Sequence, residues 1–131
     1  MKALTLHQPW AWLVAEGLKQ YETRSWATSY RGPLAIHAGK RKPKADECNS
    51  AVIHAVGGIY KLQFLTLGAV VCIVDLVECI PTQRLDCIDI STDRAFGDFT
   101  PGRWAWRLAN VRKIEPVAAR GAQGLWEWKQ L

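Results

Sequence analysis

The chain has 131 residues and 49% hydrophobic residues, enough for one compact core and too many for a disordered chain. Its net charge of +5 favours polyanionic partners, chiefly nucleic acid, although a basic surface can also serve solubility alone. The N-terminus lacks the order of a secretory signal, and the longest apolar run, 67–77, is too short to span a bilayer. We therefore expect one cytoplasmic, monomeric domain over residues 1–131 with no membrane contact.

Four cysteines, Cys48, Cys72, Cys79 and Cys87, could pair on number alone. No Cys-x-x-Cys pair occurs, and Cys72 lies inside an apolar run. These features favour free thiols in a reducing compartment over disulfides. No pair has the spacing of zinc ligands, so we expect neither a metal site nor a cofactor.

The first half of the chain predicts short strands around one helix. Residues 2–6 mix apolar and β-prone types and predict a strand. A helix is expected from Pro9, because the first turn has no partner for the N–H that proline lacks, and it should end at Gly17. Residues 20–26 alternate as a strand does, and 34–37 predict another strand after a turn.

The second half predicts one more helix and three more strands. A helix is expected over 45–56, and a central strand, apolar on both faces, over 68–80. Residues 81–102 carry turn signals and predict a long loop, which in a small domain is more often functional or mobile than inert. Short strands are expected over 104–108 and 125–128. Together the elements predict an α+β fold with a small β-barrel.

Three parts of the sequence contain motifs that point to one family. The first is LHQPWA at 6–11, and the second is GLKQYETRSW at 17–26, followed by YRGPLAIHA at 30–38. The third is GRWAW at 102–106 with GAQGLW at 121–126. Together these segments resemble the ASCH family, a PUA-like family whose signature G-x-K-x-x-E-x-R the second segment satisfies. The resemblance implies a PUA-like β-barrel with helices packed around it and a cleft lined by the signature. Members of the family have been proposed to bind RNA, some relatives are nucleases, and a small bacterial branch hydrolyses the acetyl amide of acetylated cytidine.

Lys19, Glu22 and Arg24 are the signature residues with chemistry to offer. On a strand Glu22 and Arg24 share one face, while Thr23 points to the other. Arg24 can hold a phosphate or carbonyl with two hydrogen bonds, and Lys19, expected at the mouth of the cleft, can act as a general base with Glu22. The alternative is structural: Glu22 and Arg24 form an ion pair that ties the strand down.

The catalytic alternative depends on one departure from the family pattern. The amidohydrolase branch uses a Lys as base, a Thr three positions later as nucleophile, and a Glu from elsewhere. Lys19 matches that Lys, but Glu22 stands at the Thr position, which argues against acyl-enzyme chemistry. Glu22 could instead activate water while Lys19 or Arg24 stabilises the oxyanion. Sequence thus leaves a small hydrolase, acting on an acylated nucleoside or on RNA, as the alternative to a binding domain.

The tryptophans divide into expected core residues and expected ligand contacts. Trp12, Trp106 and Trp126 are expected in the core, whereas a Trp beside a polar or basic signature residue is a candidate to stack on a base. The basic run 40–44 could contact phosphates or form a solvated loop. The expected ligand-binding residues are Gln8, Trp10, Arg24, Trp26, Lys40, Arg103 and Trp104.

Two further polar residues are expected to be structural. Asp75 interrupts the central apolar strand, and a carboxylate there needs a partner, most simply a backbone N–H or an Arg. His37 ends a predicted strand, and a lone His is more often a packing residue with satisfied nitrogens. The leading hypothesis is a domain that binds RNA or a nucleotide-like small molecule. A pure protein-interaction domain is neither supported nor excluded.

Overall fold

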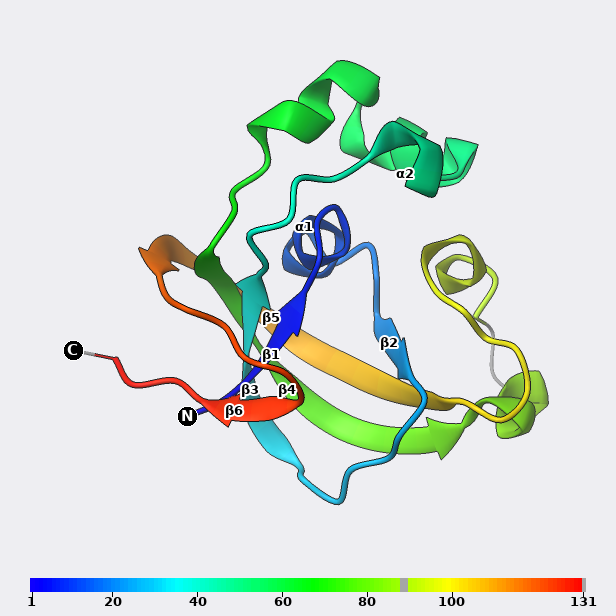
Figure 1. Cartoon of the computed structure of the whole chain (residues 1–131). Helices are drawn as coiled ribbons and strands as arrows, with labels where there is room; N and C mark the ends of the chain where they lie inside the picture. The colour runs from blue at the N-terminus through cyan, green and yellow to red at the C-terminus, as the bar shows by residue number, and fades with distance from the viewer. Residues whose placement is uncertain (88–89, 131) are drawn as a thin grey trace.

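The computed structural model describes residues 1–87 and 90–130, with side chains described throughout these ranges except at 86 and 87. Its centre is a six-stranded sheet in the order β2-β5-β4-β3-β1-β6, which curls into a half-barrel (Figure 1). The fold is α+β, as the sequence predicts. The strands are β1 (Lys2–Leu6), β2 (Tyr21–Arg24), β3 (Gly32–Ala38), β4 (Ala69–Pro81), β5 (Trp104–Ala118) and β6 (Leu125–Glu127). The helices are α1 (Trp10–Ala15) and α2 (Ser50–Val56), with the 3₁₀ helices η1 (Ala45–Glu47), η2 (Ile59–Phe64), η3 (Thr82–Cys87) and η4 (Asp93–Phe96).

The long β4–β5 pair gives the sheet its curvature. These antiparallel strands have 13 and 15 residues, and their register shifts at three places along the pair. Such irregularities bend a strand and increase its twist. β1 pairs with β3 in parallel, the one parallel pair among the described strands, and β2 lies at the edge beside β5. The outer edge of β2 therefore has backbone groups that can bond to residues of the loops.

Helix α1 lies between the sheet and a second helical layer. Ala11 and Val14 pack against the sheet with the fully buried Trp106, while Leu13 packs against α2 and η2 (Figure 1). α1 starts where expected because the side-chain oxygen of Gln8 accepts a hydrogen bond of 2.9 Å from the N–H of Trp12. The helix therefore fixes the position of the segment that follows it in the chain.

Several element boundaries differ from the sequence predictions. β5 extends to Ala118 rather than ending near 108. Its second half buries little surface, and pairing with β4 stabilises it. The helix expected over 45–56 is divided into η1 and α2, since Cys48 is extended and the side chain of Asn49 caps α2. The loop expected over 81–102 contains η3 and η4. β4 is central as predicted, but its burial alternates because α1 covers one face only.

A buried polar cluster holds the C-terminal segment on β1 and β3. The Nε1 of Trp126 donates to Thr5 Oγ1 over 3.0 Å, and Thr5 Oγ1 lies 3.1 Å from Nδ1 of His37. The carbonyl oxygen of Ala119, 2.7 Å from His37 Nε2, can only accept. In the neutral ring Nε2 therefore carries the hydrogen, and Nδ1 accepts from Thr5. His37 is a packing residue with both nitrogens satisfied, as expected from the sequence.

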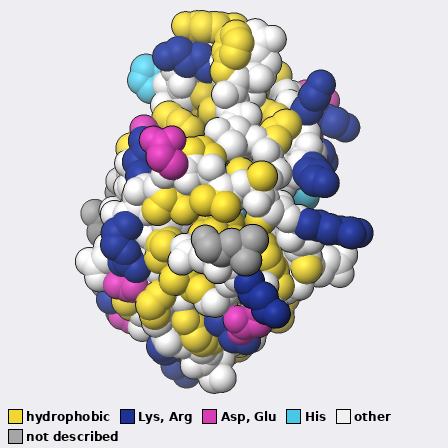
Figure 2. All heavy atoms as spheres, turned by 90° about the vertical axis from the view of Figure 1, so that its left-hand side faces the viewer, with side chains coloured by type: hydrophobic (Ala, Val, Ile, Leu, Met, Phe, Trp, Pro, Cys, Tyr) yellow, Lys and Arg dark blue, Asp and Glu magenta, His cyan; other side chains and the backbone are white. Residues whose placement is uncertain are grey.

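The surface of the molecule is mixed in character. Figure 2 shows hydrophobic side chains together with Lys and Arg at the top of the molecule, where Figure 1 places the helical layer. Cys48, Cys72 and Cys79 are free thiols, whereas the side chain of Cys87 lies outside the described residues. Among the described residues, no helix has the length and apolar character needed to cross a lipid bilayer.

Candidate functional site

The pocket that contains the signature residues lies at the open edge of β2. It has a volume of about 360 Å³ and is lined by Trp10 of α1, by Lys19, Glu22 and Thr23, by Asn49, and by residues 95–98. Parts of the chain far apart in sequence therefore build its walls. The pocket contains both residues predicted as catalytic, Lys19 and Glu22, and one predicted ligand contact, Trp10.

Lys19 lies at the floor of the pocket. Its side chain is 1% exposed, and its Nζ donates to the backbone carbonyl of Phe96 over 2.5 Å. The same Nζ is 3.4 Å from Glu22 Oε1 and 5.8 Å from the centroid of the Trp10 ring. The expectation that Lys19 lies at the mouth of the cleft is wrong, because segment 95–98 folds over its end and covers it.

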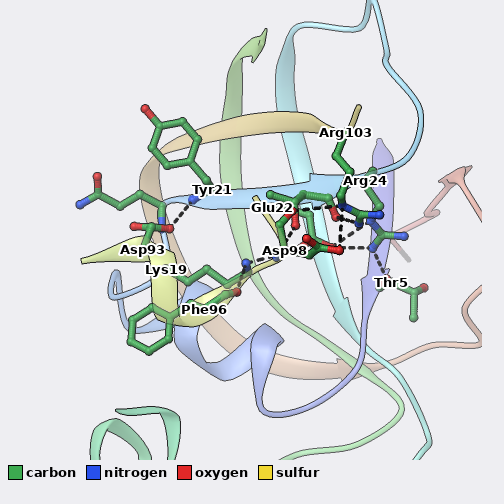
Figure 3. A network of polar contacts seen from close by, with 11 residues as sticks. Thr5, Lys19, Tyr21, Glu22, Arg24, Asp93, Phe96, Asp98 and Arg103 are labelled. Atoms are coloured by element: carbon green, nitrogen blue, oxygen red, sulfur yellow. Dashed lines mark hydrogen bonds and ion pairs between the residues drawn. The ribbon is translucent and has the colours of Figure 1, made fainter. Parts of the chain in front are cut away.

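Glu22 is shared between two cations. Its Oε1 faces Lys19, while its Oε2 accepts from Arg24, at 2.9 Å from Nε and 2.8 Å from Nη2 (Figure 3). Arg24 Nη2 also donates to the carbonyl of Thr5 over 3.0 Å, so the row of charges is anchored on β1. The side chains of Glu22 and Arg24 are 12% and 24% exposed. The ion pair expected between them is present, and it belongs to the edge of the pocket.

The segment around η4 closes the pocket by binding the backbone of β2. Asp93 Oδ2 accepts hydrogen bonds of 2.8 Å from the N–H groups of Tyr21, the first residue of β2, and of Gln20 before it (Figure 3). Burial of this carboxylate raises the pKa of Asp93, while the two N–H groups and Lys19 lower it by less. Asp93 was not singled out in the sequence, whose only signal there was an unusually long loop.

Thr23 lines the same pocket as Glu22. Its Oγ1 accepts a hydrogen bond of 3.1 Å from the N–H of Asp98. A Cβ added at Gly97 would lie 3.2 Å from Thr23 Oγ1 and 3.4 Å from Lys19 Nζ, so both groups border the space beside this glycine. The expectation that Thr23 points away from the site is wrong. Side chains of both faces reach the pocket, because it lies around the edge of the sheet rather than over one face.

Asn49 joins the helical layer to the pocket. Its Oδ1 accepts from the N–H of Val52 over 2.9 Å and so caps α2, while its Nδ2 donates to the carbonyl of Ala95 over 2.8 Å. One side chain therefore positions both the start of α2 and the segment over Lys19. Sequence reasoning missed Asn49, although an Asn before a helical pattern is a recognisable capping signal.

Arg103 lies beside the pocket and supports its rim. Its Nε donates to the carbonyl of Asp98 over 3.1 Å, and its Nη2 donates to the carbonyl of Thr23 over 3.2 Å. These bonds hold segment 95–98 against β2. Arg103, which was predicted to contact the ligand, thus supports the rim of the pocket through hydrogen bonds to the backbone.

The other predicted ligand contacts lie outside this pocket. Gln8 is buried, donates to the carbonyl of Thr66 over 2.8 Å, and lines a separate hollow of about 210 Å³. Trp26 packs edge-on against Trp106, with ring centroids 4.8 Å apart. Trp104 is packed against the core, and Lys40 is an exposed residue near Gly68. The tryptophans expected in the core are buried at Trp106 and half-buried at Trp12 and Trp126.

Two Arg side chains lie near His7. His7 follows β1, and its pKa is lowered by burial first and then by the charges of Arg41 and Arg24. Arg41 also pairs with Glu47, at 2.9 Å from Oε1. Burial is the larger cause of the lowered pKa of His7, and the two guanidinium groups near it are each paired with a carboxylate, Arg24 with Glu22 and Arg41 with Glu47.

The carboxylates of the central strand lie elsewhere and are paired. Asp75 accepts from Arg112 at 3.1 Å and from Asn110 at 2.9 Å, and these two hydrogen bonds lower the pKa of Asp75. The structural partner predicted for Asp75 is confirmed. Glu78 pairs with Arg107 at 2.8 Å. Among the described residues, no three His, Cys, Asp or Glu side chains are grouped as metal ligands.

Comparisons with known proteins agree with this architecture. The family model of the ASCH domain matches residues 4–118. Activating signal cointegrator 1 of Homo sapiens is 37% identical over 86 residues, and that of Mus musculus is 35% identical. Each match covers 62% of this chain and 15% of the relative, so the chain spans a small part of these proteins' length.

Solved structures show the same fold. The crystal structure of ASCH from Zymomonas mobilis has a TM-score of 0.58 at 14% identity, covering 89% of this chain and 72% of that chain. A single-substitution variant of the same protein has a TM-score of 0.53 at 15% identity, over 89% and 74% of the two chains. At such low identity the likeness shows the fold and not the ligand.

Proposed function

Because the chain belongs to the ASCH domain family, a PUA-like family proposed to bind RNA, we propose that it binds single-stranded RNA or a nucleotide-like ligand in the pocket at the edge of β2. One observation carries the proposal: the pocket combines an ion pair, Lys19 with Glu22, and an aromatic ring, Trp10, within about 360 Å³. A base needs both, since its edge forms hydrogen bonds and its face stacks.

The size and polarity of the pocket favour a single base. Ligand pockets range from about 300 to 1,000 Å³, so this one is at the small end. Glu22 offers a carboxylate that accepts from an amino or ring N–H group on the edge of a base. Lys19, which is buried under segment 95–98, lies 3.4 Å from this carboxylate and holds it in the pocket.

The surroundings favour a ligand that carries phosphate. The guanidinium groups of Arg24 and Arg41 lie near His7, each paired with a carboxylate, and the chain as a whole has a net charge of +5. Binding of phosphates by such groups releases counterions, so affinity should fall steeply as salt rises. Removal of the four charges at Lys40, Arg41, Lys42 and Lys44 should weaken binding and flatten that slope.

The test is a chemical-shift map of the protein with cytidine, acetylated cytidine and a short single-stranded RNA. Shifts should concentrate at Trp10, Lys19, Glu22 and residues 95–98. Glu22→Gln and Trp10→Ala should each weaken binding at least several-fold, whereas Lys129→Ala, a charge change at an exposed position after β6, should not. Shifts elsewhere on the chain, or binding that is indifferent to salt, would refute the proposal.

A second candidate, a small hydrolase, has one observation in its favour. Thr23 Oγ1 and Lys19 Nζ both border Gly97, and Glu22 lines the same pocket. Hydrolysis of an acylated nucleoside would add water across the amide C–N bond and release acetate and the free amine. Thr23, whose acyl ester a water then cleaves, or a water held by Glu22, would attack the carbonyl carbon. Lys19 would act as the base that takes the proton of the attacking hydroxyl and returns it to the leaving amine, with Arg24 near the oxyanion. A ribonuclease is the other hydrolytic possibility.

Acetate release from acetylated cytidine separates catalysis from binding. Catalysis predicts turnover that is lost in Lys19→Ala and Lys19→Arg, and a comparison of Thr23→Val with Glu22→Gln identifies the attacking group. Binding alone predicts no turnover, with most affinity retained in Lys19→Arg. Absence of turnover across acylated nucleosides and RNA oligomers would leave the binding function.

We also propose, from sequence, that residues 1–131 form one domain that acts as a cytoplasmic monomer. The matched range 4–118 is consistent with a single unit. Sedimentation velocity checks the monomer, and limited proteolysis checks the single domain, because a single unit should yield no stable smaller fragment.

A further inference from the structure

An exposed apolar surface lies on the helical layer. Ile59, Tyr60 and Phe64, all in η2, are 61%, 62% and 74% exposed, more than any other large hydrophobic residue described. Figure 2 shows hydrophobic side chains at the top of the molecule, where Figure 1 places this layer. Three such side chains within six residues form a patch rather than scattered exposure.

Hollows open between these side chains. One of about 510 Å³ is bordered by Lys42, Ile59 and Tyr60, and a second of about 330 Å³ lies between Tyr60 and Phe64 over Trp12. A third, of about 720 Å³, reaches from Ile59 along α2. We call the side chains of η2 with these three hollows the η2 surface. Hollows of this kind accept large apolar side chains from a partner.

The charges beside the η2 surface are mainly positive. Residues 40–64 contain five Lys or Arg and only two acidic residues, of which Glu47 pairs with Arg41. Lys42 borders the first hollow and Lys61 the one next to Phe64. A partner of complementary charge is therefore acidic.

We propose that the η2 surface binds an acidic peptide segment of another protein, one that inserts large apolar side chains into the hollows while its carboxylates face Lys42 and Lys61. Ile59, Leu62 and Leu67 give the first hollow aliphatic walls, which suit apolar side chains. A flat lipid surface would leave the hollows unfilled. The η2 surface is distinct from the pocket at β2, so this proposal does not depend on the RNA proposal.

Selection from a library of random displayed peptides tests the proposal. The full chain is the target, and the double variant Ile59→Ser/Phe64→Ser is used for counter-selection. The peptides enriched on the wild type should carry net negative charge and at least one large apolar residue. No enrichment over the double variant, or enrichment of uncharged or basic peptides, overturns the proposal.

Synthetic peptides from the selection then identify the contacts. Phe64→Ser should lower affinity more than about tenfold, as loss of an aromatic anchor does, and Lys42→Glu/Lys61→Glu should lower it and reverse its salt dependence. Val117→Ser, at a residue of β5 that is 43% exposed, and Lys129→Glu are matched controls and should change nothing. Because all these side chains are exposed, the thermal midpoints should stay near wild type.

Other ligands of the η2 surface would give different binding results. Single-stranded RNA, or vesicles of phosphatidylcholine and phosphatidylserine, would bind the wild type and lose affinity for Ile59→Ser/Phe64→Ser. A second copy of the chain would appear in sedimentation as self-association that the same variant abolishes. Either result overturns the peptide proposal. A Glu22→Gln variant that loses RNA binding but keeps peptide binding separates it from the function of the pocket.

Discussion

The ammonium of Lys19 donates a hydrogen bond of 2.5 Å to the backbone carbonyl of Phe96, which lies 77 residues further along the chain. This contact fastens the last residue of η4 to the segment that follows α1 and places a buried cation under the pocket. Folding of the segment and formation of the site are therefore one event, and changes at either residue should affect both.

Replacement of Lys19 by Met should lower the free energy of unfolding by about 2 kcal/mol, because Met fills the space but leaves the Phe96 carbonyl without its donor. Glu22 keeps Arg24, which limits the loss. Urea denaturation measures the change, and hydrogen exchange should rise in peptides covering 94–98. Lys129→Met, at an exposed position, is the control. An unchanged midpoint with unchanged exchange would show that Lys19 does not hold the segment.

Asn49→Ala should cost about 1 kcal/mol, since it removes the cap of α2 as well as the bond to the Ala95 carbonyl. Asn49→Ser keeps a capping oxygen but loses the Nδ2 donor, so it should recover most of the stability of α2 without restoring the contact to Ala95. Chemical denaturation and ligand affinity together separate the two roles. Equal stability of the two variants would argue against capping.

Asp93→Asn should change how stability depends on pH. Burial raises the pKa of Asp93 in the folded protein above its ordinary value of 3.8, so the folded state holds its proton to higher pH than the unfolded state does. Between those two values the wild type loses stability as pH rises, and Asn cannot titrate. The free energy of unfolding of the wild type minus that of the variant should therefore fall through this window and then level off. A difference that is flat with pH would contradict the assignment.

Binding of a phosphate-bearing ligand should raise the pKa of His7. Burial and the charges of Arg41 and Arg24 now lower it, and an anion beside these cations favours the protonated ring. NMR titration of the His7 ring with and without a short RNA measures the shift. Cytidine, which has no phosphate, is the control and should produce little change. An equal effect of cytidine and RNA would place the phosphates elsewhere.

Cys72 should resist alkylation in the native protein. Its side chain is fully buried, and burial raises the pKa of its thiol to about 12, so both access and thiolate are lacking. At mildly alkaline pH, site-resolved mass spectrometry should find Cys79, which is half-buried, labelled well before Cys72. Denaturant should remove the difference. Comparable labelling of both sites without denaturant would show that the core opens more readily than its packing suggests.

Local patterns in the sequence predict the frame of this molecule well. The strand at 2–6, the turn of helix after Pro9 and the strand of the signature have strong local signals, and the structure confirms them at nearly those residues. The grouping of Lys19, Glu22 and Trp10 could also be predicted, because Trp10 begins α1 and the other two residues follow this short helix in the sequence.

Long-range partners set the rest. Asp93 has no distinguishing neighbours in the sequence, and its role appears only when η4 lies against the edge of β2. The outer half of β5, residues 110–118, mixes polar and apolar residues and is mostly exposed, so only its pairing with β4 identifies it as strand. Gln8 belongs to the LHQPWA segment that resembles the family and was expected to contact the ligand, yet its amide is used within the fold.

Because Glu22 contacts two cations through different oxygens, a ligand can bind at one oxygen without loss of the contact at the other. Arg24 holds Oε2 and is itself held by the Thr5 carbonyl, whatever occurs at Oε1. A ligand amino group that displaces Lys19 from Oε1 would break a contact of 3.4 Å and leave no carboxylate stranded without a cation. The Glu22 carboxylate can then release Lys19 from Oε1 and regain it in each binding cycle. Arg24 keeps its hydrogen bonds to Oε2 throughout, so the strand stays in place.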